Sequence, residues 1–363
     1  MRLAFLTSGG PHPDGEGLIY RWIRIRAKSY HNRKHEVAVF SQPKKILPDE
    51  YSLDGVPYTL LNPRKAAQAL KAFSPDAVLI HHVSPWTTKV ADAVSFPKIF
   101  WIYGAEVVPP SESYYEPGRV TRFFLGMLDR REKRRFARHL STGRRFVCTS
   151  RYAMGKLLEL LPQAAESADV LYAPVEASFA AREFSSPLKG LALEPLEHRT
   201  LLASGVDLMI RAYAGISKTS LTLAGAGNAV YDLTRWIGER KSAIELKSMN
   251  IPAGALSELL ASHDYLVIAS RHERQLLVAS EAMARGLPVI APRAWAFPEA
   301  AIDGATGATF EVESVDELRG AIGALLAGHA GLSAGARAWV KSNCALDSVI
   351  ERELALIAAG IEA

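Results

Sequence analysis

The sequence has little of what disulfide-bonded, zinc-binding or membrane-spanning proteins need. Its 363 residues include two cysteines, Cys148 and Cys344, which lie far apart and belong to no Cys-x-x-Cys or Cys/His cluster. The longest apolar run, residues 354–359, has six residues, whereas a membrane-spanning helix needs about 20. These absences exclude a disulfide framework, a structural zinc site and a membrane span.

The N-terminal residues also lack the hydrophobic segment of a secretory signal. Met1–Leu6 contains only a four-residue apolar stretch, which is followed by the polar turn Thr7–Gly10. Together with two unpaired cysteines, this indicates a cytoplasmic protein.

What is present is the composition of a globular protein, with 48% hydrophobic and 22% charged residues. The length suggests two domains. The net charge of +5 conceals an asymmetry: residues 1–181 carry 26 Lys/Arg against 17 Asp/Glu (+9), and the remainder carries 17 against 21 (−4). A basic half indicates an anionic partner such as a nucleic acid, a membrane surface or a substrate.

Short apolar runs alternate with helical stretches in the first half of the chain. The clearest helix is Val120–Leu140, which carries an apolar stripe spaced at i, i+3, i+4, i+7 and i+8. The runs that read as strands are Arg2–Thr7, Glu36–Phe40, Ala77–His81, Lys98–Tyr103, Arg145–Thr149 and Ala168–Tyr172. This pattern predicts a parallel sheet covered on both faces, hence a doubly wound α/β domain.

The pattern breaks around Glu176–Pro195, where we place the linker, and alternation resumes at Ser220. We expect three parts: an N-terminal Rossmann-like domain over 1–181, a C-terminal Rossmann-like domain over 182–345, and a C-terminal helix over 346–363 that could pack back on the first domain. Ligands of such sheets bind at the carboxyl ends of the strands, so two facing domains would form an interdomain cleft.

The most informative stretch runs from Tyr265 to Ala291. After a strand, Glu273 stands in a polar loop, Glu281 stands in the first turns of the following helix, and Gly286 ends that helix before the next strand. Amides at a helix N-terminus bind a diphosphate, and carboxylates accept hydrogen bonds from ribose and hexose hydroxyls. The arrangement therefore suits a sugar nucleotide. The alternative is an ordinary strand–helix–strand unit with two solvated glutamates.

This stretch resembles the retaining glycosyltransferases of family 4, whose hallmark is Glu-x7-Glu followed by Ala-Met-Ala-x-Gly-x-Pro-Val-Ile-Ala, matched by residues 281–291. The resemblance implies a GT-B fold of two facing Rossmann-like domains with an interdomain cleft. It also implies a UDP- or GDP-sugar donor, with Glu281 on the ribose, Glu273 on the donor sugar, and retention without an obligatory metal. No Asp-x-Asp motif is present, and no cofactor is expected.

In the first half, the Gly-rich segment from Leu6 to Gly17 resembles the family's loop near the donor phosphate, which makes Gly9 and Gly10 candidates, although a mere turn is the alternative. The segment does not fit a P-loop. Tyr103-Gly104-Ala-Glu106 resembles the family's His-Gly-x-Glu, with Tyr103 at the position of a catalytic His. His82, after His81 at the end of the neighbouring strand, is a further catalytic candidate or a structural histidine.

Other donor-site positions depart from the family. The family's Arg and Lys near the start of the second domain correspond to Arg199 and Ser204. Residues Arg274, Gln275, Leu276 and Leu277 replace its Gly-Phe-Gly-Leu; Arg274 could supply the cation missing at Ser204, or be a surface arginine. Gly225 and Gly227 resemble its second Gly-rich turn.

A basic segment follows in the helix over 120–140, with eight Lys/Arg between residues 130 and 145. Placed on the polar side of an amphipathic helix, these charges could hold an anionic membrane or acceptor, or simply form a solvated face. The candidate residues for this surface are Arg130, Arg131, Lys133, Arg134, Arg135 and Arg138. Nucleic acid is not expected, because no known module accompanies the charge.

The leading hypothesis is a cytoplasmic, hexosyltransferase-like enzyme that acts in envelope or exopolysaccharide biosynthesis on a glycan or a lipid-linked acceptor, with attachment to the inner face of the membrane as a further option. The departures at Tyr103, Ser204 and Arg274 motivate an alternative: a non-catalytic GT-B protein that binds a sugar nucleotide or a glycan as a partner subunit. A sugar-nucleotide epimerase fits the fold but matches the Glu281 segment less well.

Overall fold

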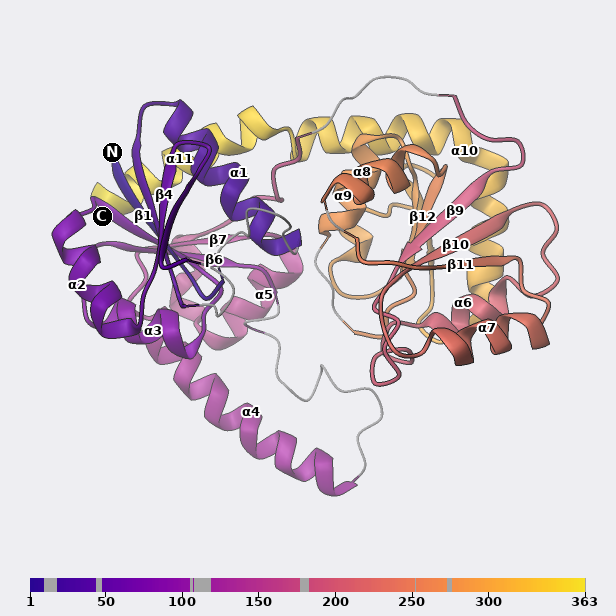
Figure 1. Ribbon diagram of the computed structural model, residues 1–363, viewed down its shortest axis with the longest axis horizontal. Coiled ribbons are helices and arrows are strands. Elements are labelled where there is room, and N and C mark those ends of the chain that lie inside the picture. Colours follow the sequence, from indigo (N-terminus) through magenta and orange to yellow (C-terminus); the bar gives the residue numbers. More distant parts are fainter. Residues whose placement is uncertain are drawn as a thin grey trace. The chain divides into compact units, whose positions relative to one another are not determined.

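The computed structural model describes residues 1–9, 18–43, 48–104, 107, 119–176, 183–251, 253–272 and 276–362. The chain forms two compact units (Figure 1). Unit 1 comprises Met1–Ser111, Arg119–Pro174 and Leu346–Ala363, and unit 2 comprises Glu112–Gly118 and Val175–Ala345. The last helix of the chain therefore belongs to unit 1.

In the described part of unit 1, one sheet has the order β3-β4-β2-β1-β5-β6-β7-β8. All neighbouring strands are parallel except β3 and β4, which form an antiparallel hairpin at one edge. The order reverses between β1 and β5, which is the switch point where such sheets bind ligands. The strands are β1 (Arg2–Thr7), β2 (Glu36–Ser41), β3 (Glu50–Leu53), β4 (Val56–Leu60), β5 (Ala77–His81), β6 (Lys98–Ile102), β7 (Arg145–Cys148) and β8 (Ala168–Val170).

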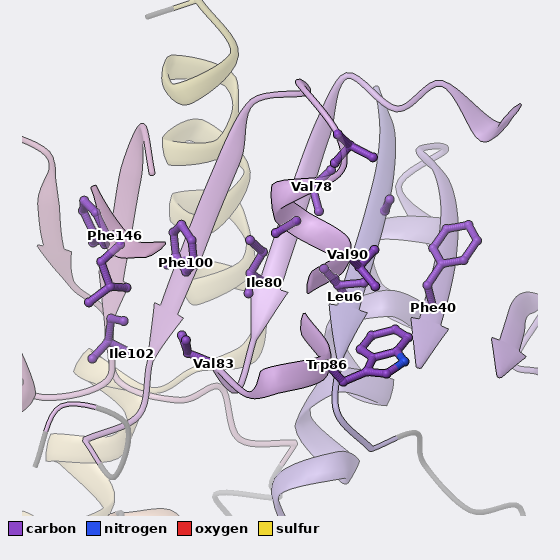
Figure 2. Packing of buried hydrophobic residues seen from close by; sticks show 14 of the residues in the cluster. Leu6, Phe40, Val78, Ile80, Val83, Trp86, Val90, Phe100, Ile102 and Phe146 are labelled. Carbon is purple, nitrogen blue, oxygen red and sulfur yellow. The ribbon is translucent and has the colours of Figure 1, made fainter. Parts of the chain in front are cut away.

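Helices cover both faces of this sheet. On one face, alternate strand residues such as Leu6, Ile80 and Phe100 pack under Trp86 and Val90 of one helix (Figure 2). On the other face lie the first and last helices of the chain, which contact each other. The helices are α1 (Leu18–Asn32), α2 (Pro63–Phe73), α3 (Pro85–Asp92), α4 (Arg119–Leu140), α5 (Arg151–Leu160) and α11 (Leu346–Glu362), with a 3-10 turn at Pro162–Glu166.

Unit 2 is a second Rossmann-like unit. Its sheet is parallel in the order β11-β10-β9-β12-β13-β14, so its switch point lies between β9 and β12. The strands are β9 (Lys189–Leu193), β10 (Ser220–Gly225), β11 (Ile244–Ser248), β12 (Tyr265–Val267), β13 (Val289–Pro292) and β14 (Gly307–Phe310). The helices are α6 (Val206–Ala212), α7 (Val230–Glu239), α8 (Ala253–Ala261), α9 (Leu277–Ala284) and α10 (Val315–Asn343), with a 3-10 turn at Phe297–Glu299.

The prediction of two doubly wound α/β domains is confirmed, but it missed three strands. The hairpin β3–β4 turns at Asp54-Gly55, a turn signal that was overlooked. Strand β9, central in the sheet of unit 2, lies in the segment that was assigned to the linker. Its sequence signal for a strand is weak because it contains Gly190. An added Cβ at this position would lie 2.6 Å from the Tyr265 ring. A small residue is therefore required in this strand for packing.

Candidate functional site

The carboxyl edge of the sheet in unit 2 carries the predicted donor residues on loops that follow neighbouring strands. Arg199 lies after β9, Gly225 ends β10 and Gly227 follows it, and Glu281 stands on the helix after β12. The parallel sheet brings these loops to the same edge, beside the switch point. Glu273, Arg274 and Gln275 lie outside the described residues.

Glu281 stands on α9, whose described residues are largely buried. The side chains of Leu276, Leu277 and Glu281 are 7%, 5% and 4% exposed. A buried carboxylate is costly unless it is hydrogen-bonded or paired, and a glutamate with no function would be favoured on the surface. This burial distinguishes Glu281 from the solvated residue of the alternative interpretation.

The loop after β9 offers positive charge to the same edge. Arg199 is exposed, and no hydrogen bond or ion pair joins its side chain to another residue in the described ranges. Ser204, at the position of the family's lysine, is fully buried. The exposed guanidinium of Arg199 is therefore available to an anionic ligand, whereas the position of Ser204 supplies no cation.

His198 was missed by the sequence reasoning. Its Nε2 lies 2.7 Å from Asp232 Oδ2 on α7, and its Nδ1 lies 3.0 Å from Asn228 Oδ1, which also accepts the His198 amide. The hydrogen bond to Asp232, supported by the one to Asn228, raises the pKa of His198 above its usual value. His198 thus ties the loop after β9 to the loop after β10. Its only sequence signal is its position beside Arg199.

Gly225 and Gly227 have a packing reason that the sequence could not show. A Cβ at Gly225 would lie 1.9 Å from the carbonyl oxygen of Glu194, and one at Gly227 would lie 2.1 Å from that of Leu196. The chain after β9 continues beside this turn, with Leu196 N donating to Ala226 O at 2.9 Å. These contacts account for both glycines without a ligand.

The carboxyl edge of unit 1 brings together Gly9, His82, Tyr103 and Gly104 after β1, β5 and β6; Gly10 lies outside the described residues. Thr7 Oγ1 lies 3.5 Å from His82 Nδ1. His82 has a φ of 61°, which is costly for a residue other than glycine. Such strained residues cluster at functional sites, and this one stands at the switch point of the sheet.

Tyr103 is buried within a group of stacked rings. Its ring lies 4.9 Å from that of His82, with nearly parallel planes, and its hydroxyl is 2.7 Å from His81 Nδ1. Burial lowers the pKa of His82 to about 4, and burial, followed by the charge of Arg26, holds that of His81 well below its usual range. Both imidazoles are therefore neutral at pH 7. In this state His82 can donate or accept a hydrogen bond but cannot supply a positive charge to a ligand.

Helix α4 has the predicted extent, but its apolar stripe is not buried. Phe123, Phe124, Met127 and Leu128 are 68%, 59%, 56% and 45% exposed, and their half of the helix projects beyond the sheet of unit 1 (Figure 1). The prediction that the basic residues occupy the opposite, polar side was wrong for Arg131, Arg134 and Arg138. Arg131, Lys133, Arg134 and Arg138 are exposed, whereas the side chains of Arg130 and Arg135 are not described.

Helical spacing shows how the two sets of α4 residues are related. Arg131 and Arg138 follow Phe124 at i+7 and i+14, and Arg134 follows Met127 at i+7, so these arginines continue the apolar stripe along one face. Lys133 lies on the other side of the helix. We call the seven exposed residues Phe123, Phe124, Met127, Leu128, Arg131, Arg134 and Arg138 the α4 stripe. Within the described ranges, no helix is long and apolar enough to cross a membrane.

Comparisons with known proteins agree with this architecture. No curated protein matches the chain by sequence. Among solved structures, sucrose-phosphate synthase from Thermosynechococcus elongatus is similar with a TM-score of 0.80 at 16% identity, over 98% of each chain. Anabaena HepE in complex with UDP-glucose has a TM-score of 0.75 at 16% identity, over 100% of this chain and 99% of that one.

WaaG, a glycosyltransferase involved in lipopolysaccharide biosynthesis, has a TM-score of 0.67 at 17% identity, over 98% of this chain and 99% of that one. At these identities the structural likeness shows the fold, which is GT-B. The family model of Glycosyl transferases group 1 matches residues 199–328, all within unit 2. The sequence match to this family therefore lies in unit 2, while the structural likeness, which shows the GT-B fold, extends over both units.

Proposed function

We propose that the protein is a retaining glycosyltransferase of family 4 that transfers a sugar from a nucleoside diphosphate sugar without an obligatory metal. The bond from the anomeric carbon to the diphosphate breaks, a bond to the acceptor oxygen forms on the same face, and a diphosphate oxygen takes the acceptor proton. The observation that carries the proposal is the buried Glu281 at the carboxyl edge of unit 2, inside the segment that matches the family model.

Four site residues have roles in this proposal. Glu281 accepts hydrogen bonds from the ribose, Glu273 contacts the donor sugar, and Arg199 faces the diphosphate, where a fixed cation stabilises the growing negative charge. His82, neutral at pH 7, is a hydrogen-bonding candidate at the carboxyl edge of unit 1. We favour a uracil base because HepE binds UDP and UDP-glucose. The acceptor is a glycan or a lipid-linked glycan of the cell envelope, by analogy with WaaG.

Replacing Glu281 by glutamine tests the ribose assignment. The substitution keeps the shape but removes the charge, and a hydrogen bond to a charged group contributes about 1.5–3 kcal/mol. We therefore expect the Kd for UDP, measured by calorimetry, to rise roughly tenfold to a hundredfold. Glu258→Gln, on the exposed surface of α8, is the matched control and should leave the Kd unchanged. An unchanged Kd for Glu281→Gln would show the assignment to be wrong.

A second candidate, a non-catalytic GT-B protein that binds a sugar nucleotide or glycan as a partner subunit, is favoured by two observations. Ser204 is buried where the family has a cation, and the hydroxyl of Tyr103 is bonded to His81. An assay for the release of UDP from UDP-sugars distinguishes the enzyme from the non-catalytic protein. The assay is run with envelope glycans as acceptors, in the presence and in the absence of a chelator. Binding without release supports the non-catalytic protein, and loss of release on chelation contradicts the metal-free mechanism.

We further propose that the α4 stripe attaches unit 1 to an anionic membrane surface. Large exposed apolar side chains mark interaction surfaces, and each basic residue near an anionic bilayer contributes about 1 kcal/mol. Since Phe123, Phe124, Met127 and Leu128 share a face with Arg131, Arg134 and Arg138, one face can bury rings between headgroups while its arginines contact lipid phosphates. A second copy of the chain is a poorer occupant, because two basic faces repel.

Vesicle sedimentation checks this attachment. Phe123→Ser/Phe124→Ser should weaken binding to vesicles of phosphatidylcholine with phosphatidylglycerol at least tenfold, because each buried ring contributes about 2 kcal/mol. Arg134→Gln should weaken it about fivefold, whereas Lys133→Gln, which removes the same charge from the other side of the helix, should have less effect. Equal effects of Arg134→Gln and Lys133→Gln would contradict attachment through this face.

A further inference from the structure

Arg271 lies four residues after the end of β12, and every N–H group of its guanidinium has a hydrogen-bond partner. Its side chain is 3% exposed. Its Nη1 and Nη2 donate to Oδ1 and Oδ2 of Asp207, its Nε and Nη2 donate to Oε1 and Oε2 of Glu313, and Nη1 also donates to the carbonyl oxygen of Leu202. A guanidinium has five N–H donors, and these partners use all five.

These partners come from three different parts of unit 2. Leu202 lies in the loop before α6, Asp207 lies in the first turn of α6, and Glu313 lies between β14 and α10. The main chain adds a further link, because the amide of Arg271 donates to the carbonyl oxygen of Ala203 at 2.8 Å. Arg271 therefore binds the loop after β12 to the loop that precedes α6.

Both of these loops border the proposed donor site. The loop after β12 leads directly to residue 273, and the loop before α6 follows Arg199 and contains Ser204. They flank the switch point between β9 and β12, where Rossmann-like sheets hold their ligands. With both carboxylates bound to it and its side chain buried, Arg271 cannot itself replace the cation that is missing at Ser204.

We propose that Arg271 is a positioning residue of the donor site: it fixes the spacing between the loops 202–205 and 270–272, and with it the position of Arg199 relative to the carboxyl end of β12. The inference rests on the proposed function. Bidentate Arg–carboxylate pairs set geometry as well as energy, and a shift of about 1 Å in a catalytic group can lower a rate roughly a hundredfold. Because Glu281 is held separately on α9, the binding of the nucleotide alone depends less on this spacing.

Arg271→Lys and Glu313→Gln test the inference. Lysine keeps the charge but cannot bind two carboxylates and a carbonyl with paired donors. Glu313→Gln removes one carboxylate charge at a position outside both loops. For each variant we expect kcat for UDP release from the best UDP-sugar to fall at least tenfold, with the Kd for UDP changed less than threefold. Arg293→Lys is the matched control, because Arg293 pairs with Glu311 at 2.7 Å on the exposed surface of unit 2.

Two readouts separate failure of this inference from failure of the proposed function. Hydrogen exchange of the amides in 202–205 and 270–272 should accelerate at least tenfold in Arg271→Lys and remain unchanged in Arg293→Lys, whether or not any nucleotide binds. Unchanged exchange overturns the inference, and so do kcat values within twofold of the unsubstituted protein when UDP binds. If the unsubstituted protein binds no nucleotide while exchange accelerates, the donor assignment is wrong and the inference falls with it, although the link between the loops is real.

Discussion

Replacing Glu353 by alanine is expected to lower the free energy of unfolding of unit 1 by about 3–5 kcal/mol. Glu353 on α11 and Arg26 on α1 are both 0% exposed, with Nη2 and Oε1 2.7 Å apart. The Nε of Arg26 also donates to Oε1, and the hydroxyl of Tyr30 donates to Oε2 at 2.7 Å. Removing the carboxylate leaves a buried guanidinium without its counter-charge, which is one of the most costly changes available in a protein interior.

A neighbouring ion pair supplies the control. Arg33, in the turn directly after α1, and Asp347 on α11 form an ion pair at 2.6 Å, but the Asp347 side chain is 83% exposed. Exposed pairs contribute about 0–1 kcal/mol, so Asp347→Ala should have little effect. Urea unfolding followed by hydrogen exchange of the β5 and α11 peptides measures both variants on unit 1 itself. A loss below about 1 kcal/mol for Glu353→Ala would show that Arg26 finds another counter-charge or reaches water.

A double variant distinguishes the charge from the packing. Buried ion pairs can often be replaced by apolar residues of similar volume at little cost. Arg26→Met/Glu353→Leu should therefore recover most of the stability that Glu353→Ala loses, even though it lacks both charges. If the double variant is no better than the single one, the cost lies in lost packing or in the hydroxyl of Tyr30, which loses its acceptor in both.

This ion pair also shows the limit of what the sequence can predict. Arg26 and Glu353 are 327 residues apart, and each occupies a helix whose sequence reads as amphipathic. A charged residue on the polar side of such a helix is ordinarily solvated. Nothing local indicates that α1 and α11 lie together on one sheet face and bury these two charges against each other, so the contact becomes visible only in the fold.

The elements that the sequence predicted well are those whose signal is local. Strand β12, helix α9 and strand β13 were expected close to their observed bounds, because apolar runs and the end of the helix at Gly286 are read directly from neighbouring residues. The exposure of the α4 stripe was not predicted, because it depends on what lies next to the helix and not on neighbouring residues. The spacing of Phe123 and Met127 predicts an apolar helix face equally well whether that face contacts a core or is exposed. Arg271 reads as one more polar residue in a loop, because its carboxylate partners are distant in sequence.

Replacing Gly205 by alanine is expected to destabilise unit 2 by about 3 kcal/mol or more. Gly205 has a φ of 68°, and an added Cβ would lie 1.8 Å from the carbonyl oxygen of Ala269 and 2.6 Å from its carbonyl carbon. A left-handed conformation costs roughly 1–2 kcal/mol for a residue with a Cβ. Overpacking against a backbone that cannot move freely adds about 1–3 kcal/mol.

Gly215 provides the control that separates these two costs. Its φ is 76°, close to that of Gly205, but a Cβ there would meet no atom within 4 Å. Gly215→Ala should therefore show the conformational cost alone, roughly 1–2 kcal/mol in urea unfolding, and the difference between the two variants measures the clash with Ala269. Equal losses for the two variants would mean that the loop before α6 moves away from β12 without cost.

The position of the clash connects stability with donor binding. Ala269 lies between the end of β12 and Arg271, so relief of the contact must separate the two loops that Arg271 joins. Gly205→Ala should therefore lower kcat for UDP release in the same way as Arg271→Lys, whereas Gly215→Ala, at the far end of α6, should not. If Gly205→Ala is destabilised but keeps its kcat, the contact serves the folding of unit 2 and the spacing of these loops does not limit the reaction.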